Sequence, residues 1–314
     1  MPYFGSKAFL FVKFICRRID GRMEIYMSNY RIFTDSACDI KQELLDEWGV
    51  ACKCLTFRFD DSEKEYTDRD MPTTEFYDKM RKGGVAKTAA VNVDSFAEAF
   101  EMALKNGDDV LYLGFSSGLS TTYNSARLAA LQLAEKYPER KIIAIDTLAA
   151  SAGFGMLVYL AVEKKREGAS IEENAEYVKS LIPSIDHWFS VDDLVYLKRG
   201  GRVSPAAAFF GNALGIKPVM HVDNEGHLIP VAKVRGRRNA LLEIANRYAE
   251  LAKDPEKGPV FISHGDCLND VMTLEQMLNE KHGIKFDVIT DVGPVIGAHS
   301  GPGTIALFFI GKER

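Results

Sequence analysis

Between residues 30 and 183 the sequence alternates strand-like with helix-like segments, and this alternation limits the possible folds more than any other feature. Each apolar, β-branched run ends in polar residues and is followed by a segment with helical spacing. Strands that alternate with helices in this way form a largely parallel sheet with helices on both faces. We expect strands at residues 30–36, 109–115 and 141–146, and helices at residues 40–50, 73–82, 95–107, 119–137 and 148–165.

Local signals give more detailed expectations for the first part of the chain. Asp39 is expected to be the N-cap of the first helix, and the Ser95 to Glu98 spacing predicts a capping box at the start of the 95–107 helix. The runs CKCLTFRF (52–59) and KEYTD (64–68), separated by DDSE, predict a hairpin.

From about residue 184 the pattern changes, because hairpins mix with helices. The run MHVDNEGHLIPVAKV (220–234) predicts two strands around an Asn-Glu-Gly turn, and RRNALLEIANRYAELAKD (237–254) predicts a helix. Such a mixture is typical of an α+β unit. The sequence therefore predicts an α/β domain at 30–183 and a smaller α+β domain at 184–314.

Composition limits the classes of function. The chain has 314 residues, enough for two cores, and a net charge of −5, which offers no basic stripe for a nucleic acid. Its five cysteines are odd in number and follow no CxxC spacing, which favours a reducing, cytoplasmic setting. We expect no nucleic-acid partner, no metal and no cofactor.

Residues 1–29 stand apart from this pattern. AFLFVKFICRR joins a short apolar run to basic residues, but the run is too short to span a bilayer and lacks a small-residue cleavage site. We interpret the segment as a leader, a tag or the product of an upstream start, and leave it out of the fold.

Polar clusters follow the predicted parallel strands, where open sheets bind their ligands. They are TDS (34–36), FSSGLSTTY (115–123) and DT (146–147). Hydroxyls and backbone N–H groups at helix starts favour an anion, and the absence of lysine and arginine from these loops favours a weakly charged one such as a carboxylate. The alternative is that these residues only cap helices.

Small residues occupy one end of the apolar helix at 148–162. Ala150, Gly153 and Gly155 leave space for a second backbone or for a long apolar ligand, although close helix–sheet packing explains them equally well. Further along, YLKRGGRVS places Arg202 after two glycines, where it can meet a phosphate or a carboxylate of a partner. The basic residues Lys217, Lys233, Arg235, Arg237 and Arg238 are expected to be solvated surface charges.

The stretch GPVIGAHSGPGTIALFF (293–309) sets His299 among four glycines before an apolar strand. So many glycines indicate that the backbone passes close to another segment or to a ligand. A lone histidine in such a loop is more often a packed or turn residue than a ligand-binding one.

Eight segments of the sequence form a larger pattern: TDSACD, KTAAVN, SSGLSTTYNSA, DTLAASAGFG, YLKRGGRVS, GIKPVM, VRGRR and GPVIGAHSGPGTIALFF. In their order and spacing they resemble the DegV family of bacterial fatty-acid-binding proteins. The resemblance covers nearly everything from Tyr30 onward. It implies a two-domain α/β fold that encloses one long-chain fatty acid of the palmitate, stearate or oleate type, with the carboxylate at the domain junction and the acyl chain inside the first domain. Some members carry lipid for a fatty acid kinase, whose separate subunit phosphorylates the bound carboxylate.

By position, the resemblance assigns the carboxylate to Thr88, Ser117 with the adjacent Ser116, and His299. It places Arg202 at the pocket mouth, for a phosphoryl group or a partner. Ala150, Gly153 and Gly155 are then expected to line the acyl chain, and the 293–309 segment to return to the ligand site. Ala89, Ala90 and Thr121 depart from the usual residues of the family. The preferred acyl chain and the exact head-group contacts therefore stay open. Transient contact with a membrane surface is expected for lipid exchange.

Two other functions deserve comparison. GFSSG (114–118) satisfies the G-x-S-x-G spacing of a serine hydrolase, with Ser116 as nucleophile, although this pattern arises easily in a glycine-rich loop. A kinase acting alone would need a nucleotide-binding motif, and the sequence contains neither a Walker A motif nor a GxGxxG after a strand. The carrier hypothesis is therefore preferred to both.

Overall fold

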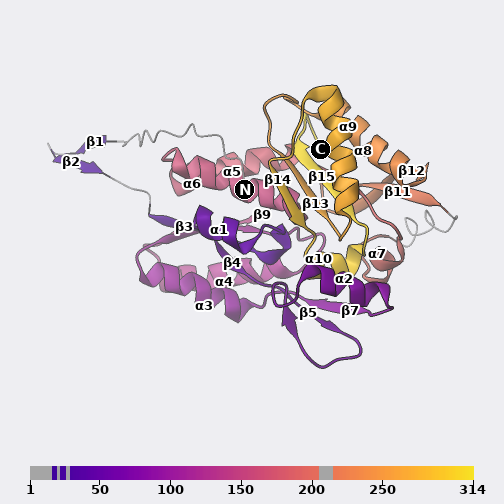
Figure 1. The fold of residues 1–314 in the computed structure, drawn as a ribbon. Coiled ribbons are helices and arrows are strands. Elements are labelled where there is room, and N and C mark those ends of the chain that lie inside the picture. The colour runs from indigo at the N-terminus through magenta and orange to yellow at the C-terminus, as the bar shows by residue number, and fades with distance from the viewer. Residues whose placement is uncertain (1–15, 20–21, 26–28, 205–214) are drawn as a thin grey trace.

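Two sheets lie on either side of one buried helix in the computed structural model, which describes residues 16–19, 22–25, 29–204 and 215–314 (Figure 1). The first sheet has the order β4-β3-β8-β9, and all of its neighbouring pairs are parallel. Its strands are β3 (Tyr30–Asp35), β4 (Ala51–Lys53), β8 (Asp109–Gly114) and β9 (Ile142–Asp146). The predicted parallel α/β architecture is thus confirmed.

Helices cover both faces of this sheet. The pair α3 (Val93–Lys105) and α4 (Thr122–Lys136) packs on one face, and α5 (Ser151–Arg166) with α6 (Ile171–Leu181) packs on the other (Figure 1). Helix α1 (Gln42–Trp48) follows the short 3-10 turn η1 (Ser36–Cys38) and contacts β4.

The second sheet has the order β12-β11-β10-β15-β13-β14, in which β13 and β14 are parallel and the other neighbours antiparallel. Its strands are β10 (Ile185–Ser190), β11 (Ile216–Val222), β12 (Leu228–Arg235), β13 (Val260–His264), β14 (Val288–Asp291) and β15 (Ile305–Ile310). Helices α8 (Arg237–Leu251) and α9 (Leu268–His282) cover its outer face. This mixture matches the α+β character predicted for the second part.

Helix α5 lies between the two sheets and contacts β3 and β8 of the first and β10, β13 and β15 of the second. Ten of its residues are buried, as the apolar run predicts for a helix covered all round. The predicted boundary at residue 183 falls within η2 (Ile182–Ser184), between α6 and β10. Because α5 belongs to both layers, the domain boundaries stay a prediction.

A third, three-stranded sheet corrects the predicted hairpin. The run at 52–59 is not one strand: β4 ends at Lys53 in the parallel sheet, and β5 (Thr56–Phe59) begins a separate sheet of order β6-β5-β7. Strand β6 (Tyr66–Thr67) does pair with β5, as predicted, and β7 (Ala86–Ala89) flanks β5 on its other side. Helix α2 (Thr73–Arg81) connects β6 to β7.

Two predicted helix caps are wrong. Helix α3 begins earlier than expected, at Val93, because the side chain of Asn92 accepts a hydrogen bond from the Ser95 N–H at 2.8 Å. Helix α1 has Lys41 at its N-cap, while Asp39 adopts a left-handed conformation with φ 52° and directs its carboxylate elsewhere.

Part of the predicted leader forms a small sheet of its own. Strands β1 (Cys16–Ile19) and β2 (Arg22–Ile25) pair with each other antiparallel and lie away from the layered body (Figure 1). Residues 1–15, 20–21 and 26–28 of this segment lie outside the described residues, as do residues 205–214 after the GGR segment.

Candidate functional site

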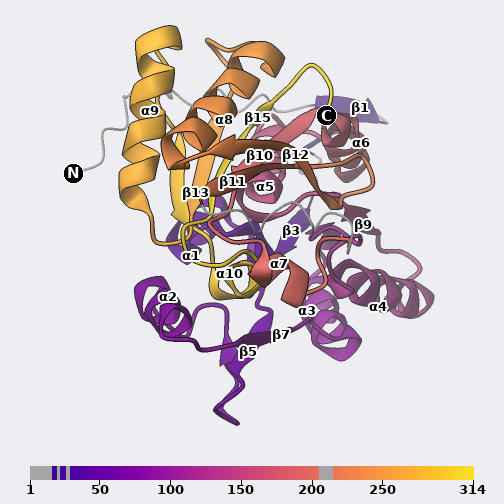
Figure 2. The same cartoon turned by 90° about the vertical axis from the view of Figure 1, so that its right-hand side faces the viewer.

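A cavity of about 500 Å³ lies between the two sheets, at the carboxyl ends of the parallel strands. Its volume falls within the range of ligand-binding pockets, roughly 300–1,000 Å³. The first part of the chain contributes the loop after β8, the start of α5 and strand β7, and the second part contributes β10, β15 and helix α10 (Pro294–Ser300). Figure 2 shows α10 beside α7 (Val195–Arg199), between the three-stranded and the six-stranded sheets.

Thr88 and His299 meet at this cavity, as the sequence predicts. The Oγ1 atom of Thr88, on β7, lies 2.8 Å from the Nε2 atom of His299, on α10. Both side chains line the cavity and are half-buried. The Nδ1 atom of His299 is buried, and none of the described residues forms a hydrogen bond with it.

The imidazole of His299 is held in its neutral form. Burial lowers its pKa to about 4, and the nearby positive charge of Arg202 lowers the pKa in the same direction. With its proton on Nε2, a neutral imidazole donates to the Oγ1 atom of Thr88, which leaves the hydroxyl proton of Thr88 for an anion. An anion entering the cavity would favour protonation of this ring.

The segment that carries His299 is a short helix, not the predicted loop. Pro294 occupies its first turn, where the missing N–H costs nothing. The glycines after it permit close packing: Gly301 has φ 83°, and a Cβ atom there would lie 2.3 Å from the ring of Tyr196. Gly200, on another segment, leaves space for His299, because a Cβ on Gly200 would lie 2.1 Å from the imidazole Nδ1. These glycines therefore allow segments of the protein to pack closely against one another.

Side chains from the first part of the chain hold the start of α10. Asp39 accepts a hydrogen bond from the Gly293 N–H at 3.0 Å, and Asp68 accepts one from the Val295 N–H at 2.7 Å. Two carboxylates at a helix N-terminus complement the free N–H groups there. Burial raises the pKa of Asp68 to about 6 and raises that of Asp39 well above its ordinary value.

Asp39 also connects α5 to the second sheet. Its carboxylate accepts a hydrogen bond from the Ser151 hydroxyl at 2.5 Å, and Ser151 lies 2.9 Å from the hydroxyl of Ser263 on β13. The residue predicted to cap α1 is thus a junction residue, and the partners of its carboxylate, Ser151 and Gly293, come from two distant segments.

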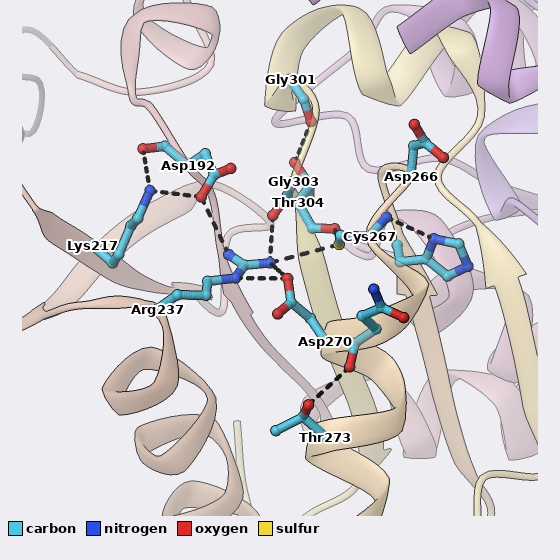
Figure 3. Close-up of polar contacts among 12 residues, drawn as sticks. Asp192, Lys217, Arg237, Asp266, Cys267, Asp270, Thr273, Gly301, Gly303 and Thr304 are labelled. Carbon is cyan, nitrogen blue, oxygen red and sulfur yellow. Dashed lines mark hydrogen bonds and ion pairs between the residues drawn. The ribbon is translucent and has the colours of Figure 1, made fainter. Parts of the chain in front are cut away.

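Arg237 holds the turn after α10 (Figure 3). Its guanidinium donates to the carbonyl of Gly303 at 2.6 Å and to the carboxylate of Asp270 at 3.0 Å, and it lies 3.8 Å from a carboxylate oxygen of Asp192. Lys217 binds the same Asp192 carboxylate at 2.6 Å. The prediction that Arg237 and Lys217 are solvated surface charges is wrong, because both fix the loops around the cavity.

Ser117 and Arg202 also line the cavity. Ser117 is exposed, and its N–H donates to the carboxylate of Asp146 at 3.1 Å. The guanidinium of Arg202 donates to the carbonyls of Leu119 and Gly200, so the residue after the GGR glycines is tied back to the loop after β8. The structure thus brings Thr88, Ser117, Arg202 and His299 to one cavity.

Ser116 has a different position from the predicted one. It is fully buried and does not line the cavity, and its hydroxyl donates to the carbonyl of Gly226 at 2.9 Å. The same oxygen accepts a hydrogen bond from the Gly118 N–H at 3.2 Å. Ser116 joins the loop after β8 to the β11–β12 turn and is not placed to bind a head group.

Of the three predicted chain-lining residues, Ala150 lines the cavity and the two glycines do not. A Cβ on Gly153 would lie 2.5 Å from the imidazole of His187, and one on Gly155 would lie 2.5 Å from Ile40. Both glycines permit close contact of α5 with its neighbours, which is the packing alternative left open by the sequence.

Sequence reasoning missed most of the apolar wall. The aromatic and aliphatic side chains that line the cavity come from both parts of the chain, so the cavity lies at the junction where the resemblance places the carboxylate, and the position of the acyl chain inside the first domain stays a prediction. On the strands these residues look like ordinary core positions, and no local signal separates them from the core. They include Leu55, Phe115, Phe189, Val222, Leu228 and Phe308.

Two features are absent from the part of the chain that the structure describes. No three or more His, Cys, Asp and Glu side chains are grouped there so that they could hold a metal ion. None of the helices there is both long and apolar enough to cross a membrane.

Comparison with known proteins gives matches along nearly the whole chain. The family model described as uncharacterised protein, DegV family, matches residues 29–312. A DegV domain-containing protein of Clostridium perfringens is 40% identical over 289 residues, which are 92% of this chain and 99% of that protein.

Solved structures give the same match in three dimensions. A fatty-acid-binding DegV family protein from Thermus thermophilus has a TM-score of 0.81 and 31% identity, covering 90% of this chain and 99% of that one. A stearic-acid-binding protein from Eubacterium ventriosum has a TM-score of 0.81 and 27% identity, covering 90% and 98%.

Proposed function

Because this chain belongs to the DegV family, we propose that it binds one long-chain fatty acid in the cavity between its two sheets and presents the carboxylate to a separate kinase subunit. The carboxylate lies at Thr88, Ser117 and His299, and the acyl chain lies along the apolar wall. The Thermus thermophilus relative, a fatty-acid-binding protein, and the Eubacterium ventriosum relative, a stearic-acid-binding protein, support the ligand class.

The observation that carries the proposal is the mixed lining of the cavity. Hydroxyls, imidazoles and one guanidinium line it, among them those of Thr88, Ser117, Arg202 and His299. Most of the other lining residues are aliphatic or aromatic. A long-chain fatty acid combines one anionic group with a long apolar chain and fits such a lining.

The head-group contacts suit a carboxylate. Thr88 and Ser117 each bring a hydroxyl donor, and the positive charge of Arg202 lies close enough to lower the pKa of His299. Hydrogen bonds to a charged acceptor contribute about 1.5–3 kcal/mol each when the groups are withdrawn from water.

Presentation to a kinase rests on the exposed side of the polar region. Ser117 is exposed and Arg202 half-buried, so a carboxylate held here remains within reach of a second protein. Arg202 would meet the transferred phosphoryl group or an acidic patch on that protein. In this proposal the chain itself has no catalytic residue, works in the cytoplasm and contacts membrane surfaces transiently to exchange lipid.

A serine hydrolase fits the geometry poorly. The Ser116 hydroxyl is buried and donates to a backbone carbonyl, whereas a nucleophile needs an exposed oxygen with a histidine or another base in reach. The carrier function is therefore preferred.

Ligand-linked stability tests the proposal. A ligand that binds only the folded state adds RT ln(1 + [L]/Kd), about 2.7 kcal/mol at a hundred times Kd. Delipidated protein reloaded with stearate should melt at a clearly higher temperature than the delipidated sample, and stearyl alcohol, which lacks the anion, should have a smaller effect. Identical melting curves at saturating stearate would contradict the carrier function.

A further inference from the structure

Three thiols come together beside the start of β5, outside the cavity. Hydrogen bonding with the thiols of Cys38 and Cys54 raises the pKa of Cys52 well above its ordinary value, and burial acts in the same direction. Cys38 is buried, whereas Cys52 and Cys54 are partly exposed. None of the three lines the cavity, so their arrangement is not explained by the proposed ligand site.

One residue separates the outer pair. Cys52 lies on β4, which ends at Lys53, and Cys54 directly follows that strand. Two residues of chain span at most about 7 Å, so the Cα atoms of the pair lie close to the range of roughly 4.4–6.8 Å that a disulfide bridges. The short separation therefore keeps the two thiols within reach of each other.

Arg69 supplies the positive charge that a reactive thiol needs. Its Nη2 atom lies 3.5 Å from the Sγ of Cys52 and 3.3 Å from the carbonyl of Ile40. A hydrogen bond from Cys52 lowers the pKa of the Cys54 thiol to about 7, and the charge of Arg69 acts in the same direction. The matched contrast is Cys267, whose pKa burial raises to about 12.

We propose that Cys54 and Cys52 form a peroxide-sensitive pair, in which Cys54 is oxidised first and Cys52 closes a reversible disulfide with it. The oxidant is hydrogen peroxide. The Cys54 thiolate attacks one peroxide oxygen, so that an S–O bond forms, the O–O bond breaks, and the departing hydroxide takes a proton to become water.

The second step consumes the sulfenic acid. The Cys52 sulfur attacks the Cys54 sulfur, so that the S–S bond forms and the S–O bond breaks, and the hydroxide leaves as water with the Cys52 proton. Two thiols are oxidised and one peroxide is reduced to two waters. A dithiol reverses the modification.

Peptide mapping tests the pair directly, because trypsin separates the three cysteines. Cleavage after Arg31, Lys41, Lys53 and Arg58 places Cys38, Cys52 and Cys54 in peptides 32–41, 42–53 and 54–58. After brief peroxide treatment of the intact protein and alkylation, we expect peptides 42–53 and 54–58 to be joined, and dithiothreitol to separate them.

Single variants assign the roles. In Cys52→Ser, Cys54 should accumulate as a sulfenic acid that dimedone traps, and in Cys54→Ser no bridge should form. Arg69→Gln should slow alkylation of Cys54 at pH 7 roughly fivefold if its thiol pKa rises by about one unit. Cys267→Ser is the control and should leave the bridge unchanged.

Three results would overturn the proposal. Peroxide could leave all three thiols free to alkylate, it could join peptide 32–41 to peptide 42–53, or Cys54 could react no faster than Cys267. Each outcome is independent of whether a fatty acid occupies the cavity, so failure here leaves the carrier function untouched.

Discussion

The Nε2 atom of His299 lies 2.8 Å from the Oγ1 atom of Thr88, although 211 residues separate them in the sequence. The contact joins β7 of the small sheet to α10, which follows the second sheet's β14. The proposed head-group site therefore exists only when the two parts of the chain are packed together. Substitutions in either part should affect fatty acid binding.

We expect Thr88→Val to weaken fatty acid binding roughly tenfold or more, since it removes a hydroxyl donor while keeping the shape of the side chain. A hydrogen bond to a charged group contributes about 1.5–3 kcal/mol. Ser117→Ala should have a similar effect. Titration with a fluorescent fatty acid measures both.

The matched control is Thr56→Val on the neighbouring strand β5, whose hydroxyl donates to Glu65 on the surface and does not line the cavity. Unchanged affinity in both Thr88→Val and Ser117→Ala would place the head group elsewhere.

Gly200→Ala should weaken binding by displacing His299. The backbone at Gly200 has φ −75°, which alanine adopts without strain, so the effect comes from the new Cβ, which would lie 2.1 Å from the imidazole. In a His299→Ala background this clash is absent, and Gly200→Ala should then change the affinity little. Equal effects in both backgrounds would show that Gly200 acts through the backbone.

Arg202→Ala should reduce acyl phosphate formation by an added kinase subunit more than it reduces lipid affinity. An acyl chain gains about 0.8 kcal/mol for each buried CH₂, and that apolar contact remains in the variant. Lipid binding and phosphorylation are measured on the same preparation, with Arg199→Ala as a neighbouring control.

Equal losses in the two assays would place Arg202 in the carboxylate site itself. Full activity in both would leave it as a residue that only ties the segment after α7 to Leu119.

The stability of the protein should depend on His299 as the pH falls. Its folded pKa of about 4 is below the ordinary value of 6.5, so its contribution is fully present above pH 6.5 and is lost as the pH falls through 4. At about 1.4 kcal/mol per pKa unit the loss amounts to at most about 3.5 kcal/mol. Urea unfolding between pH 7 and pH 4 should show a shallower loss in His299→Asn than in the unaltered protein.

The comparison with a variant is needed because other groups titrate in the same window. Burial raises the folded pKa of Asp35 and Asp68 to about 6, and their contribution falls as the pH rises through that value, opposite in sign to His299. His227→Asn, on the exposed β11–β12 turn, is the control. Parallel curves for His299→Asn and the unaltered protein would show that His299 does not titrate as described.

The guanidinium of Arg237 should matter for stability. Arg237→Ala leaves the carboxylate of Asp270 and the carbonyl of Gly303 without this donor, and we expect the free energy of unfolding to fall by about 2 kcal/mol. Arg238→Ala, at the exposed neighbouring position, should change it far less. Equal urea midpoints for the two variants would contradict the structural role.

The sequence predicts the architecture well where the signal is local. The strand–helix alternation gives the parallel sheet, and the apolar run at 148–162 gives the buried helix α5, because both depend on the spacing of neighbouring residues. The resemblance likewise selects Thr88 and His299, which the structure brings together.

What the sequence does not reveal depends on distant partners. Glycine-rich residues 293–301 look like a loop because glycine is a poor helix former, yet Asp39 and Asp68 hold the N-terminus of a helix there from more than 220 residues away. Ser116 has the sequence spacing of a nucleophile, but its hydroxyl donates a hydrogen bond to the carbonyl of Gly226. The apolar wall is hidden for the same reason, since lining and core positions have the same periodicity.

Native mass spectrometry of the purified protein, recorded before and after denaturation, tests most directly whether the protein binds a fatty acid. We expect an additional mass of a few hundred daltons in the native spectrum, lost on unfolding and identified as a single long-chain fatty acid. The additional mass should be absent or reduced in a Thr88→Val, Ser117→Ala double variant. A native mass equal to the denatured mass, even after incubation with excess stearate, would show that the protein does not carry a fatty acid.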